Sequence, residues 1–331
     1  MNKLIRAVEE KFPERRIVVI GDLVADQFLH GTIDRVSREA PVFILKHEKT
    51  ITLPGGAGNA AVNAASLGAK VFLIGLVGND INGKKLVESL RDSKVDCTGV
   101  LASSKHETVT KVRVLASRQH ATRQQVIRID YVDSKKPDEE VQKLLLGNFF
   151  KVAEQTEIII ISDYGYGVAS GEFLKEVMRF AKKREIPILV DSRYRLGEFM
   201  GVTSATPNQE EIENLIGKSI ESEEEFISEC LRLRRSLNLD ALLVTRGSKG
   251  MTLFENGKAT HLEAIGSKEP VDVTGAGDTV IATYSLALAS GLSFLEAAII
   301  ANHAGGIVVM KKGTARVEPE ELIESLRQNE K

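Results

Sequence analysis

The run Ile17-Val18-Val19-Ile20 decides the fold class, because four consecutive β-branched residues suit a strand that is buried on both faces. Three similar runs are Glu157–Ile161, Ile188–Val190 and Leu242–Val244. Segments compatible with helices lie between strands, at 57–68, 80–91, 138–151 and 171–184. This alternation predicts an α/β fold in which helices flank a doubly wound, mostly parallel sheet.

Two segments depart from this alternation, one at about residues 25–52 and the other at about 107–130. Both alternate apolar and polar residues between turn-like separators, which is typical of half-exposed antiparallel strands. We therefore expect a small β-sheet lid, formed discontinuously by these two segments, within a single domain that spans residues 1–331. A half-exposed sheet also offers a face to a second copy of the chain, so a homodimer through the lid is expected.

The composition argues against several classes of partner. The 331 residues carry 44 Lys and Arg against 46 Asp and Glu, a net charge of −2, so no global basic field favours nucleic acid. The two cysteines, Cys97 and Cys230, form no metal-binding or disulfide pattern, which favours a reducing, cytoplasmic location. The N-terminus lacks the apolar core of a signal peptide. The uncharged stretch Thr279–Leu295 is short and rich in small residues, so we expect a buried helix there and no membrane partner.

Three glycine-rich stretches compete to be a phosphate site. The first, Gly56–Ala61, satisfies the GxGxxA pattern of dinucleotide-binding proteins, but it follows the lid-like segment instead of the first core strand. That strand ends in Gly21-Asp22, with Asp26 close behind. Carboxylates at this turn would repel a pyrophosphate but suit hydroxyl groups. A nicotinamide-dependent oxidoreductase is therefore the weaker interpretation.

The second stretch, Gly78–Lys85, resembles a phosphate-binding P-loop but differs at its last position. Lys85 stands there in place of the Ser or Thr that would ligate magnesium. A helix that begins near Asp80 explains this stretch without any ligand.

The third stretch, Asp272–Thr279, opens directly onto an apolar helix. Its small residues let backbone N–H groups approach an anion, and the positive end of the helix dipole adds to their field. Asp278 lies in the first turn of that helix, where its carboxylate can accept a hydroxyl proton. An anion cradle beside such an acid is what phosphoryl transfer to an alcohol requires.

These residues give the chain a resemblance to the ribokinase-type (PfkB) sugar kinases, and most closely to the heptose 7-phosphate kinases of bacterial lipopolysaccharide-core precursor synthesis. The resemblance runs nearly end to end. The matching stretches are Gly21-Asp22 with Asp26, Arg35–Val42, Pro54–Asn59 with Ala65–Ala69, Thr110–Val114, Ser162–Tyr164, Thr206–Asn208 with Glu211, Leu243–Arg246 and Asp272–Asp278. The Gly275–Asp278 part is specific for the superfamily, whereas Arg35–Val42 and Lys111–Val114 point to the heptose branch.

The resemblance implies a ribokinase-like fold, ATP and Mg²⁺ as cofactors, and a role for each matching position. Asp278 would be the general base, while the N–H groups of Gly275, Ala276 and Gly277 hold the developing charge. The implied substrate-binding residues are Asp22, Asp26, Gly55, Gly56, Asn59, Lys111, Arg113 and Asp163. The implied nucleotide-binding residues are Asn208, Glu211, Thr245, Arg246, Gly247, Gly250, Asn302 and Gly306. Glu211 would act on the metal through water, because magnesium keeps much of its hydration shell.

The expected reaction is transfer of the γ-phosphoryl group of ATP to the anomeric hydroxyl of D-glycero-D-manno-heptose 7-phosphate. The lid cations Lys111, Arg113, Arg123 and Arg128 could hold the phosphate of such an acceptor, although each also suits a solvated strand face. Ribose, fructose, a keto-sugar acid or a nucleoside are alternative acceptors, and a sensor without catalytic activity is an alternative of another class.

Two departures from the heptose kinases bear on the acceptor. Tyr166 stands where those kinases carry Lys, and Ser192-Arg193 follows Asp191 where they carry Pro-Lys. Arg193 can supply one of the two altered charges as a forked donor, whereas Tyr166 cannot supply the other at neutral pH. These kinases are often fused to a nucleotidyltransferase, for which 331 residues leave no room, so we expect the kinase unit alone.

Overall fold

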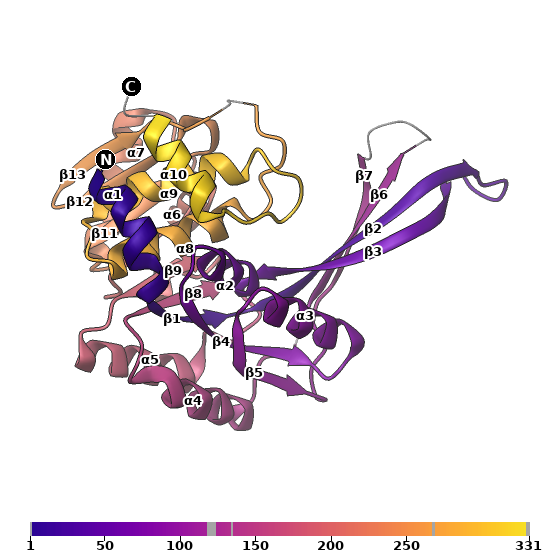
Figure 1. Cartoon of the computed structure of the whole chain (residues 1–331), viewed down its shortest axis with the longest axis horizontal. Coiled ribbons are helices and arrows are strands. Elements are labelled where there is room, and N and C mark those ends of the chain that lie inside the picture. The colour runs from indigo at the N-terminus through magenta and orange to yellow at the C-terminus, as the bar shows by residue number, and fades with distance from the viewer. Residues whose placement is uncertain (1, 118–123, 134, 267–268, 329–331) are drawn as a thin grey trace.

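The structure is a computed structural model that describes residues 2–117, 124–133, 135–266 and 269–328. In this part of the chain the strands form two sheets, one of nine strands and one of four. The nine-stranded sheet lies inside a body of helices, and the four-stranded sheet extends from that body as an arm (Figure 1). The first and last described helices lie side by side at the surface of the body.

The large sheet has the order β13-β12-β11-β10-β9-β8-β1-β4-β5. All neighbouring pairs from β5 to β11 are parallel, while β12 and β13 add an antiparallel edge. Its strands are β1 (Arg16–Gly21), β4 (Lys70–Gly78), β5 (Asp96–Ser103), β8 (Ile158–Asp163), β9 (Ile188–Ser192), β10 (Ser204–Ala205), β11 (Ala241–Thr245), β12 (Met251–Glu255) and β13 (Lys258–Leu262).

Helices cover both faces of this sheet. The α-helices are α1 (Asn2–Arg6), α2 (Ala57–Ser66), α3 (Ile81–Asp92), α4 (Glu139–Ala153), α5 (Gly171–Arg184), α6 (Gln209–Ile216), α7 (Glu223–Ser236), α8 (Ala276–Ala289), α9 (Phe294–Val308) and α10 (Pro319–Gln328). Short helical turns of other types are η1 (Ala7–Lys11), η2 (Phe12–Glu14), η3 (Leu196–Glu198) and η4 (Gly247–Lys249).

The central strand β1 shows how the two faces are filled. Ile17 and Val19 pack into one core with residues of α2, α8, α9 and α10, while Val18 and Ile20 pack into a second core with residues of α4, α5, α6 and α7. Alternate side chains of a strand point to opposite faces of its sheet, so a run that is apolar at every position requires a core on each side. The four β-branched runs and the four helical segments expected from the sequence are all confirmed, with ends that differ by a few residues.

The four-stranded sheet has the order β3-β2-β6-β7, from β2 (Leu23–Val36), β3 (Phe43–Gly56), β6 (Thr110–Ser117) and β7 (Gln124–Tyr131). Its strands come from the two segments, at about residues 25–52 and 107–130, in which apolar and polar residues alternate. The pairs β2·β3 and β6·β7 are antiparallel as expected, whereas β2 and β6 pair in parallel, a pairing that the alternation did not predict. The reason is that the two hairpins are separated by the β4–β5 region, and nothing local fixes their mutual direction.

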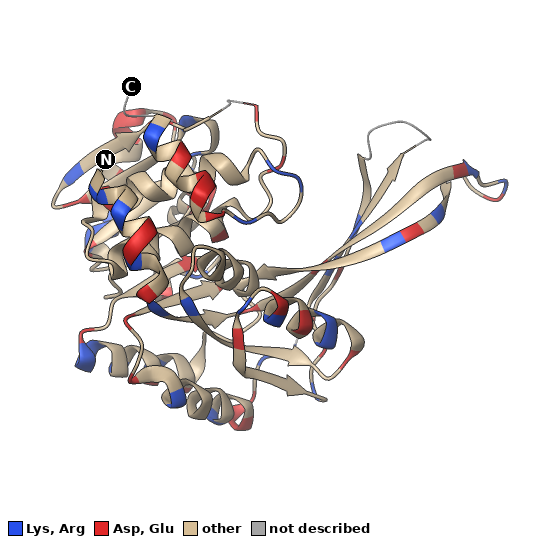
Figure 2. Ribbon diagram, in the orientation of Figure 1, with Lys and Arg blue, Asp and Glu red and all other residues tan. Residues whose placement is uncertain are grey.

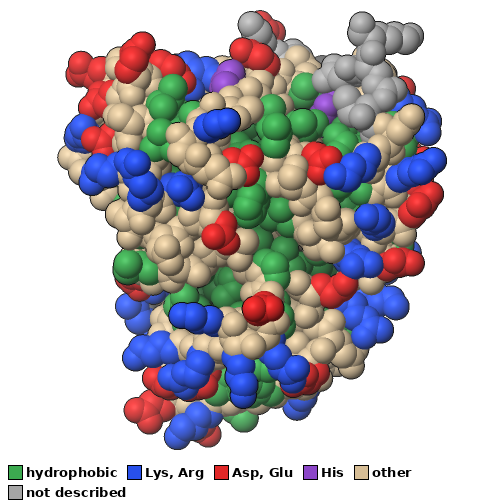
Figure 3. Space-filling model, turned by 90° about the vertical axis from the view of Figure 1, so that its left-hand side faces the viewer, with side chains coloured by type: hydrophobic (Ala, Val, Ile, Leu, Met, Phe, Trp, Pro, Cys, Tyr) green, Lys and Arg blue, Asp and Glu red, His purple; other side chains and the backbone are tan. Residues whose placement is uncertain are grey.

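Acidic and basic residues are interspersed along the ribbon (Figure 2). The face drawn in Figure 3 carries Lys and Arg along both sides and at its lower end, with hydrophobic side chains gathered toward its middle. Among the described residues, no helix has the length and apolar character needed to cross a membrane. The stretch after Thr279 forms α8, whose side chains are buried in the protein core on nearly all sides, as expected.

Candidate active site

The candidate site lies at the carboxyl ends of the parallel strands, where the strand order changes direction. The chain passes from β1 to its neighbour β4 on one side, and later returns to place β8 on the other side of β1. In open α/β sheets, ligands bind in the crevice beyond such a switch point. The loops that follow β1, β8, β9 and β11 therefore share one end of the sheet with the N-terminus of α8.

The start of α8 has the geometry of an anion cradle. Gly275 caps the helix at φ 78° and ψ 9°, a left-handed conformation that glycine adopts without strain. A Cβ atom at this residue would lie 2.4 Å from the Nδ2 atom of Asn59, so the close approach of the two segments also requires glycine. Ala276 and Gly277 follow as the first helical residues, and their N–H groups have no partner within the helix, although that of Ala276 donates to the carbonyl of Val273 at 3.3 Å. The expected Asp272–Thr279 stretch thus forms the expected helix start.

Asp278 is buried in the first turn, with one hydrogen-bond donor on each carboxylate oxygen. The Nδ2 atom of Asn59 donates to Oδ2 at 2.8 Å, and the hydroxyl of Tyr164 donates to Oδ1 at 3.1 Å. Burial raises the pKa of Asp278 to about 7, against the opposing effect of these two donors. A carboxylate with such a pKa exchanges protons near neutral pH, which suits a general base.

A cavity of about 190 Å³ lies beside this carboxylate and is lined by polar and charged groups. Its lining residues are Val24, Asp26, Gly56, Lys111, Arg113, Arg128, Tyr164, Arg193, Thr274, Gly275, Asp278 and Thr314. The main body and the four-stranded sheet both contribute to it, since Lys111, Arg113 and Arg128 come from β6 and β7. We call this cavity the polar pocket.

The cations of the polar pocket differ in how far they are neutralised. Arg113 donates to Asp26 at 2.5 Å within a largely buried ion pair, and Arg128 forms two hydrogen bonds with Asp130. Lys111 lies over the ring of Tyr164, 5.3 Å from its centroid, and burial lowers the pKa of its ammonium group. Of the substrate-binding residues expected on these strands, Asp26, Lys111 and Arg113 are therefore brought together. Arg123 lies outside the described residues.

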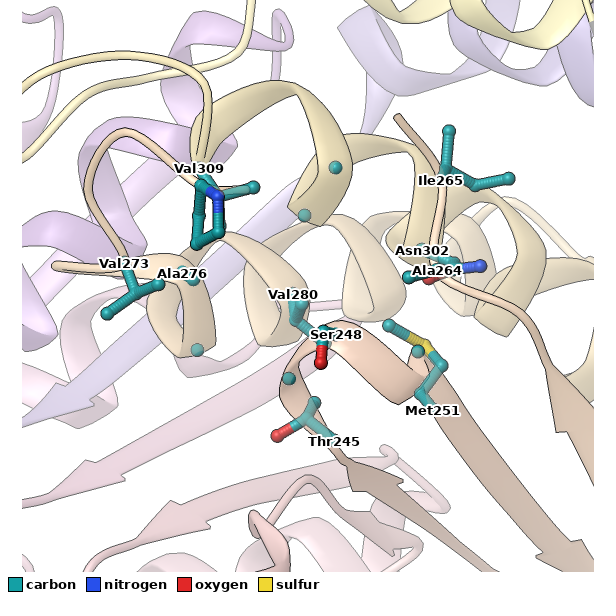
Figure 4. Close-up of a pocket in the computed structure, with 16 residues that line it drawn as sticks. Thr245, Ser248, Met251, Ala264, Ile265, Val273, Ala276, Val280, Asn302 and Val309 are labelled. Carbon is teal, nitrogen blue, oxygen red and sulfur yellow. The ribbon is translucent and has the colours of Figure 1, made fainter. Parts of the chain in front are cut away.

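A second cavity of about 190 Å³, the apolar pocket, lies on the other side of the α8 N-terminus (Figure 4). It is lined by Thr245, Gly247, Ser248, Gly250, Met251, Ala264, Ile265, Pro270, Val273, Ala276, Gly277, Val280, Asn302, Gly305, Gly306 and Val309. Figure 4 shows Asn302 gathered with Ala264 and Ile265 at one end, while Val273 and Val309 lie at the other. The Nδ2 atom of Asn302 donates to the carbonyl of Glu263, which fixes the orientation of its amide. The expected nucleotide-binding residues Thr245, Gly247, Gly250, Asn302 and Gly306 thus share one cavity.

Asn208 and Glu211 form a capping box at the start of α6, in which each side chain accepts the backbone N–H of the other at 2.8 Å. Asn208 also pairs with Thr245 in a parallel bridge, so this helix start adjoins the apolar pocket. Burial raises the pKa of Glu211, and burial with the nearby charges of Glu211 and Asp278 raises the pKa of Asp191 well above its usual range. Carboxylates that repel one another in this way offer a place for a cation.

Within the described part of the chain, no group of three or more His, Cys, Asp or Glu side chains could hold a metal ion. Mg²⁺ characteristically binds through one or two carboxylates, substrate phosphates and several waters, so Glu211 fits the ion as a ligand acting through water. A single carboxylate of this kind is consistent with a metal ion that binds together with the nucleotide and takes its other ligands from the phosphates and water.

Three residues expected to bind ligands form hydrogen bonds or ion pairs within the protein. Both oxygens of Asp22 accept backbone N–H groups of the loop after β8, and Asp163 accepts two hydrogen bonds from Arg195 and one from Ser192. Arg246 forms a bidentate ion pair with Glu223. These three side chains line neither the polar nor the apolar pocket.

Asn59 and Gly55 lie beside the polar pocket without lining it. Asn59 contacts Asp278 directly, and a Cβ atom on Gly55 would lie 2.4 Å from an oxygen of Asp26. Sequence reasoning missed Tyr164 as a contributor to the site, although its Ser-Asp-Tyr motif was a signal that could have found it. It also missed the apolar walls at Ala264 and Ile265, which belong to a segment without helix or strand periodicity.

Comparison with known proteins places this fold and site among the sugar kinases, which are phosphotransferases that act on a sugar hydroxyl. A model of the "pfkB family carbohydrate kinase" matches residues 14–321, so the chain belongs to this family. The bifunctional protein HldE of Aeromonas hydrophila is 39% identical over 318 residues, which cover 96% of this chain and 64% of that protein. HldE of Geobacter sulfurreducens is 38% identical over 311 residues, covering 93% of this chain and 62% of that protein. The chain thus spans less than two thirds of the length of these relatives.

Solved structures show the same ribokinase-like fold. Ribokinase of Arabidopsis thaliana complexed with ribose and ATP superposes with a TM-score of 0.71 at 22% identity, covering 95% of this chain and 98% of that chain. Phosphofructokinase-2 of Escherichia coli in complex with potassium superposes with a TM-score of 0.78 at 19% identity, covering 96% and 99%. Both confirm the expected fold class.

Proposed function

We propose that this protein transfers the γ-phosphoryl group of Mg²⁺·ATP to the anomeric hydroxyl of D-glycero-D-manno-heptose 7-phosphate, in the cytoplasm, as a step toward the lipopolysaccharide core. The family supports phosphoryl transfer to a sugar and the use of ATP. The heptose rests on the similarity to the HldE proteins at 38–39% identity. Two free, buried cysteines accord with a reducing compartment.

The observation that carries the proposal is the division of four consecutive residues between two pockets. Gly275 and Asp278 line the polar pocket, whereas Ala276 and Gly277 line the apolar pocket. A nucleotide in the apolar pocket and a sugar in the polar pocket would therefore meet at one helix N-terminus. That N-terminus provides both the N–H groups for the phosphoryl oxygens and the base for the acceptor.

In this mechanism the apolar side chains around Ile265 and Val280 receive the base of the nucleotide, and its phosphates extend toward the start of α8. Asp278 takes the proton of the attacking hydroxyl, while the N–H groups of Ala276 and Gly277 stabilise the charge on the transferred group. Glu211 would hold Mg²⁺ through water, and the ion would supply positive charge against the nucleotide phosphates. Positioning and charge stabilisation supply most of the rate enhancement in such a reaction.

The polar pocket supports an acceptor that already carries a phosphate. Arg193 from the loop after β9 and Lys111 and Arg128 from the four-stranded sheet line the same cavity from different parts of the fold. Arg193 thus replaces a lysine of the heptose kinases with a planar, forked donor that suits a phosphate. Tyr166, the other departure, does not line this cavity but a smaller neighbouring one.

Release of ADP with Mg²⁺ and ATP across a panel of sugars tests the acceptor. We expect D-glycero-D-manno-heptose 7-phosphate to give the highest kcat/KM, above ribose, fructose, a keto-sugar acid, a nucleoside and their phosphates. A preference for unphosphorylated sugars would contradict the use of the pocket cations. No turnover with any sugar, despite nucleotide binding, would favour a sensor.

We also propose that the chain is one domain in which the four-stranded sheet is a lid that excludes water during transfer. The strand register places Ile127, Ile129 and Tyr131 on the face opposite Arg128, and all three are exposed. This face fits a second copy of the chain, which would give a homodimer through the lid. Light scattering of Ile129→Asp should report a monomer if the chain dimerises here, and an unchanged dimer would refute this interface.

A further inference from the structure

We propose that Tyr164 is a positioning residue that orients the carboxylate of Asp278 for proton transfer. The inference rests on the proposed function, because it concerns how the base of that reaction is held. Tyr164 follows β8 directly, and its hydroxyl reaches α8 across the end of the sheet to donate to Oδ1 of Asp278.

The carboxylate of Asp278 is held from two sides. Asn59 on α2 donates to Oδ2, and Tyr164 donates to Oδ1, so rotation of the carboxylate would break one or both hydrogen bonds. Asn59 is itself held by Asn63, whose Nδ2 atom donates to the Oδ1 atom of Asn59 at 3.1 Å. The remaining lone pairs of the base are left for the acceptor hydroxyl in the polar pocket.

The loop that carries Tyr164 is itself fixed by Asp22. The Oδ2 atom of Asp22 accepts the backbone N–H groups of Tyr164 and Tyr166, both at 2.9 Å, and Oδ1 accepts that of Val168 at 3.1 Å. The ring of Tyr164 also packs against Gly56, where an added Cβ atom would lie 3.4 Å from the ring and 2.6 Å from the carbonyl of Asp22. The buried carboxylate of Asp22 thus contributes to proton transfer indirectly, because it fixes the loop that carries Tyr164.

Lys111 strengthens the donor. Its ammonium group lies over the face of the Tyr164 ring, 5.3 Å from the centroid. A positive charge at this place favours the build-up of negative charge on the phenol. The phenolic proton then becomes more acidic and the hydroxyl a better hydrogen-bond donor, while burial keeps the pKa of the phenol well above its usual value and the proton in place.

Several charged groups face Asp278 besides its two donors. Asp26 on β2 raises the pKa of its carboxyl and Lys111 on β6 lowers it, and Asp191 at the end of β9 faces it as a further carboxylate. The Tyr164 hydrogen bond favours the ionised carboxylate, so its loss should raise the pKa of Asp278. Since only the ionised form can accept a proton, the acidic limb of the kcat profile should then move to higher pH.

The test compares Tyr164→Phe with Tyr284→Phe. Tyr284 is a matched control because it is buried, lies on α8 as Asp278 does, and its hydroxyl pairs with Ser204 at 3.4 Å and not with the base. We measure kcat and KM from pH 5 to 9 with Mg²⁺, ATP and whichever sugar of the panel gives the highest turnover. Unfolding temperatures and nucleotide affinity are measured for both variants.

For Tyr164→Phe we expect the acidic limb to move up by about 0.5 to 1 pH unit and kcat at pH 7 to fall about tenfold, with a smaller change in KM. The control should keep the wild-type limb. Replacing Tyr164 by 3-fluorotyrosine, which keeps the shape and donates more strongly, should move the limb in the opposite direction. An unmoved limb in both Tyr164 variants would overturn the inference, and so would an equal shift in the Tyr284 control.

A different variant tests the proposed function separately from the role of Tyr164. If Asp278→Asn retains nearly normal turnover, Asp278 is not the base and the reaction assignment falls. If Asp278→Asn is inactive while the Tyr164 variants keep the wild-type profile, the base stands and only the positioning role of Tyr164 is refuted.

Discussion

The two pockets that meet at the start of α8 have cavities of similar volume and opposite chemistry. The apolar pocket is walled by aliphatic side chains, glycines and small residues, and none of the described residues that line it is charged. Among the described residues, four cations and two carboxylates line the polar pocket. The difference indicates how one protein handles two anionic ligands. Backbone N–H groups and shape would hold the nucleotide, and paired charges would hold the sugar phosphate.

The two pockets also differ in what supports them. The apolar pocket is backed by α8 and α9, which pack closely against each other in the larger hydrophobic core. Behind the polar pocket lie buried carboxylates. Asp22 accepts a hydrogen bond from the loop after β8, and Asp163 accepts hydrogen bonds from Arg195. Packing tolerates small changes better than a buried ionic network, which is costly when one partner is lost.

The largest expected effect is that of Asp278→Asn, which removes the one group shared by the chemistry of both pockets. We expect kcat to fall by about 10² to 10⁴, because the attacking hydroxyl loses its proton acceptor. Folding and nucleotide binding should persist, since Asn keeps the shape of the side chain. Single-turnover kinetics, unfolding temperature and calorimetric titration with ATP check these expectations.

The pH dependence sharpens this prediction. Burial raises the pKa of Asp278 to about 7, so wild-type turnover should rise with pH as the carboxyl ionises and fall below about pH 7. The residual turnover of Asp278→Asn should not show this fall below about pH 7. A wild-type profile that is flat between pH 5 and 8 would argue against this carboxylate as the base.

The next effect concerns the support of the polar pocket. Asp163→Ala should lower the free energy of unfolding by about 3 to 5 kcal/mol, because Arg195 loses its fully buried partner and keeps only the exposed carboxylate of Glu198. Glu198→Ala is the control. It removes an exposed carboxylate 3.2 Å from the same arginine and should cost less than about 1 kcal/mol. Chemical denaturation of both variants measures the difference, and similar losses would show that the buried pair is not special.

Much of the site was predictable because its determinants are local. The helix start at Gly275–Asp278 follows from small residues placed directly before an apolar helix, and the expected nucleotide residues at Thr245 and Gly250 lie next to the end of β11. The β-branched run at β1 requires two cores, which fixes the parallel sheet with helices on both faces.

The remaining features depend on contacts between distant segments. Nothing near Asp22 in sequence reveals that its carboxylate meets three N–H groups of the loop after β8, and nothing near Arg246 reveals Glu223. The same holds for the parallel pairing of β2 with β6. A charged residue in a family motif can therefore stabilise a site through contacts within the protein.

A smaller effect tests the apolar pocket alone. Val273 lines this pocket and is 63% exposed, so Val273→Asp adds a negative charge near the nucleotide without disturbing the core. We expect KM for ATP to rise about tenfold through charge repulsion, with KM for the sugar unchanged. Val271→Asp is the control, because Val271 is 50% exposed two residues away and does not line the pocket. Steady-state kinetics with each substrate varied in turn distinguish the two variants.

The smallest effect tests the polar pocket in the same way. Arg128 is an exposed residue that also pairs with Asp130, so solvent and this partner both weaken its field. Arg128→Gln should raise KM for a phosphorylated sugar about threefold to fivefold, less so at high salt, and leave KM for ATP unchanged. Arg35→Gln is the control, since Arg35 is an exposed arginine of the same sheet that pairs with Asp34 and does not line the pocket. Opposite selectivity of the Val273 and Arg128 variants would establish that the α8 N-terminus separates two binding sites. A rise in both KM values from either substitution would mean that the two pockets act as one.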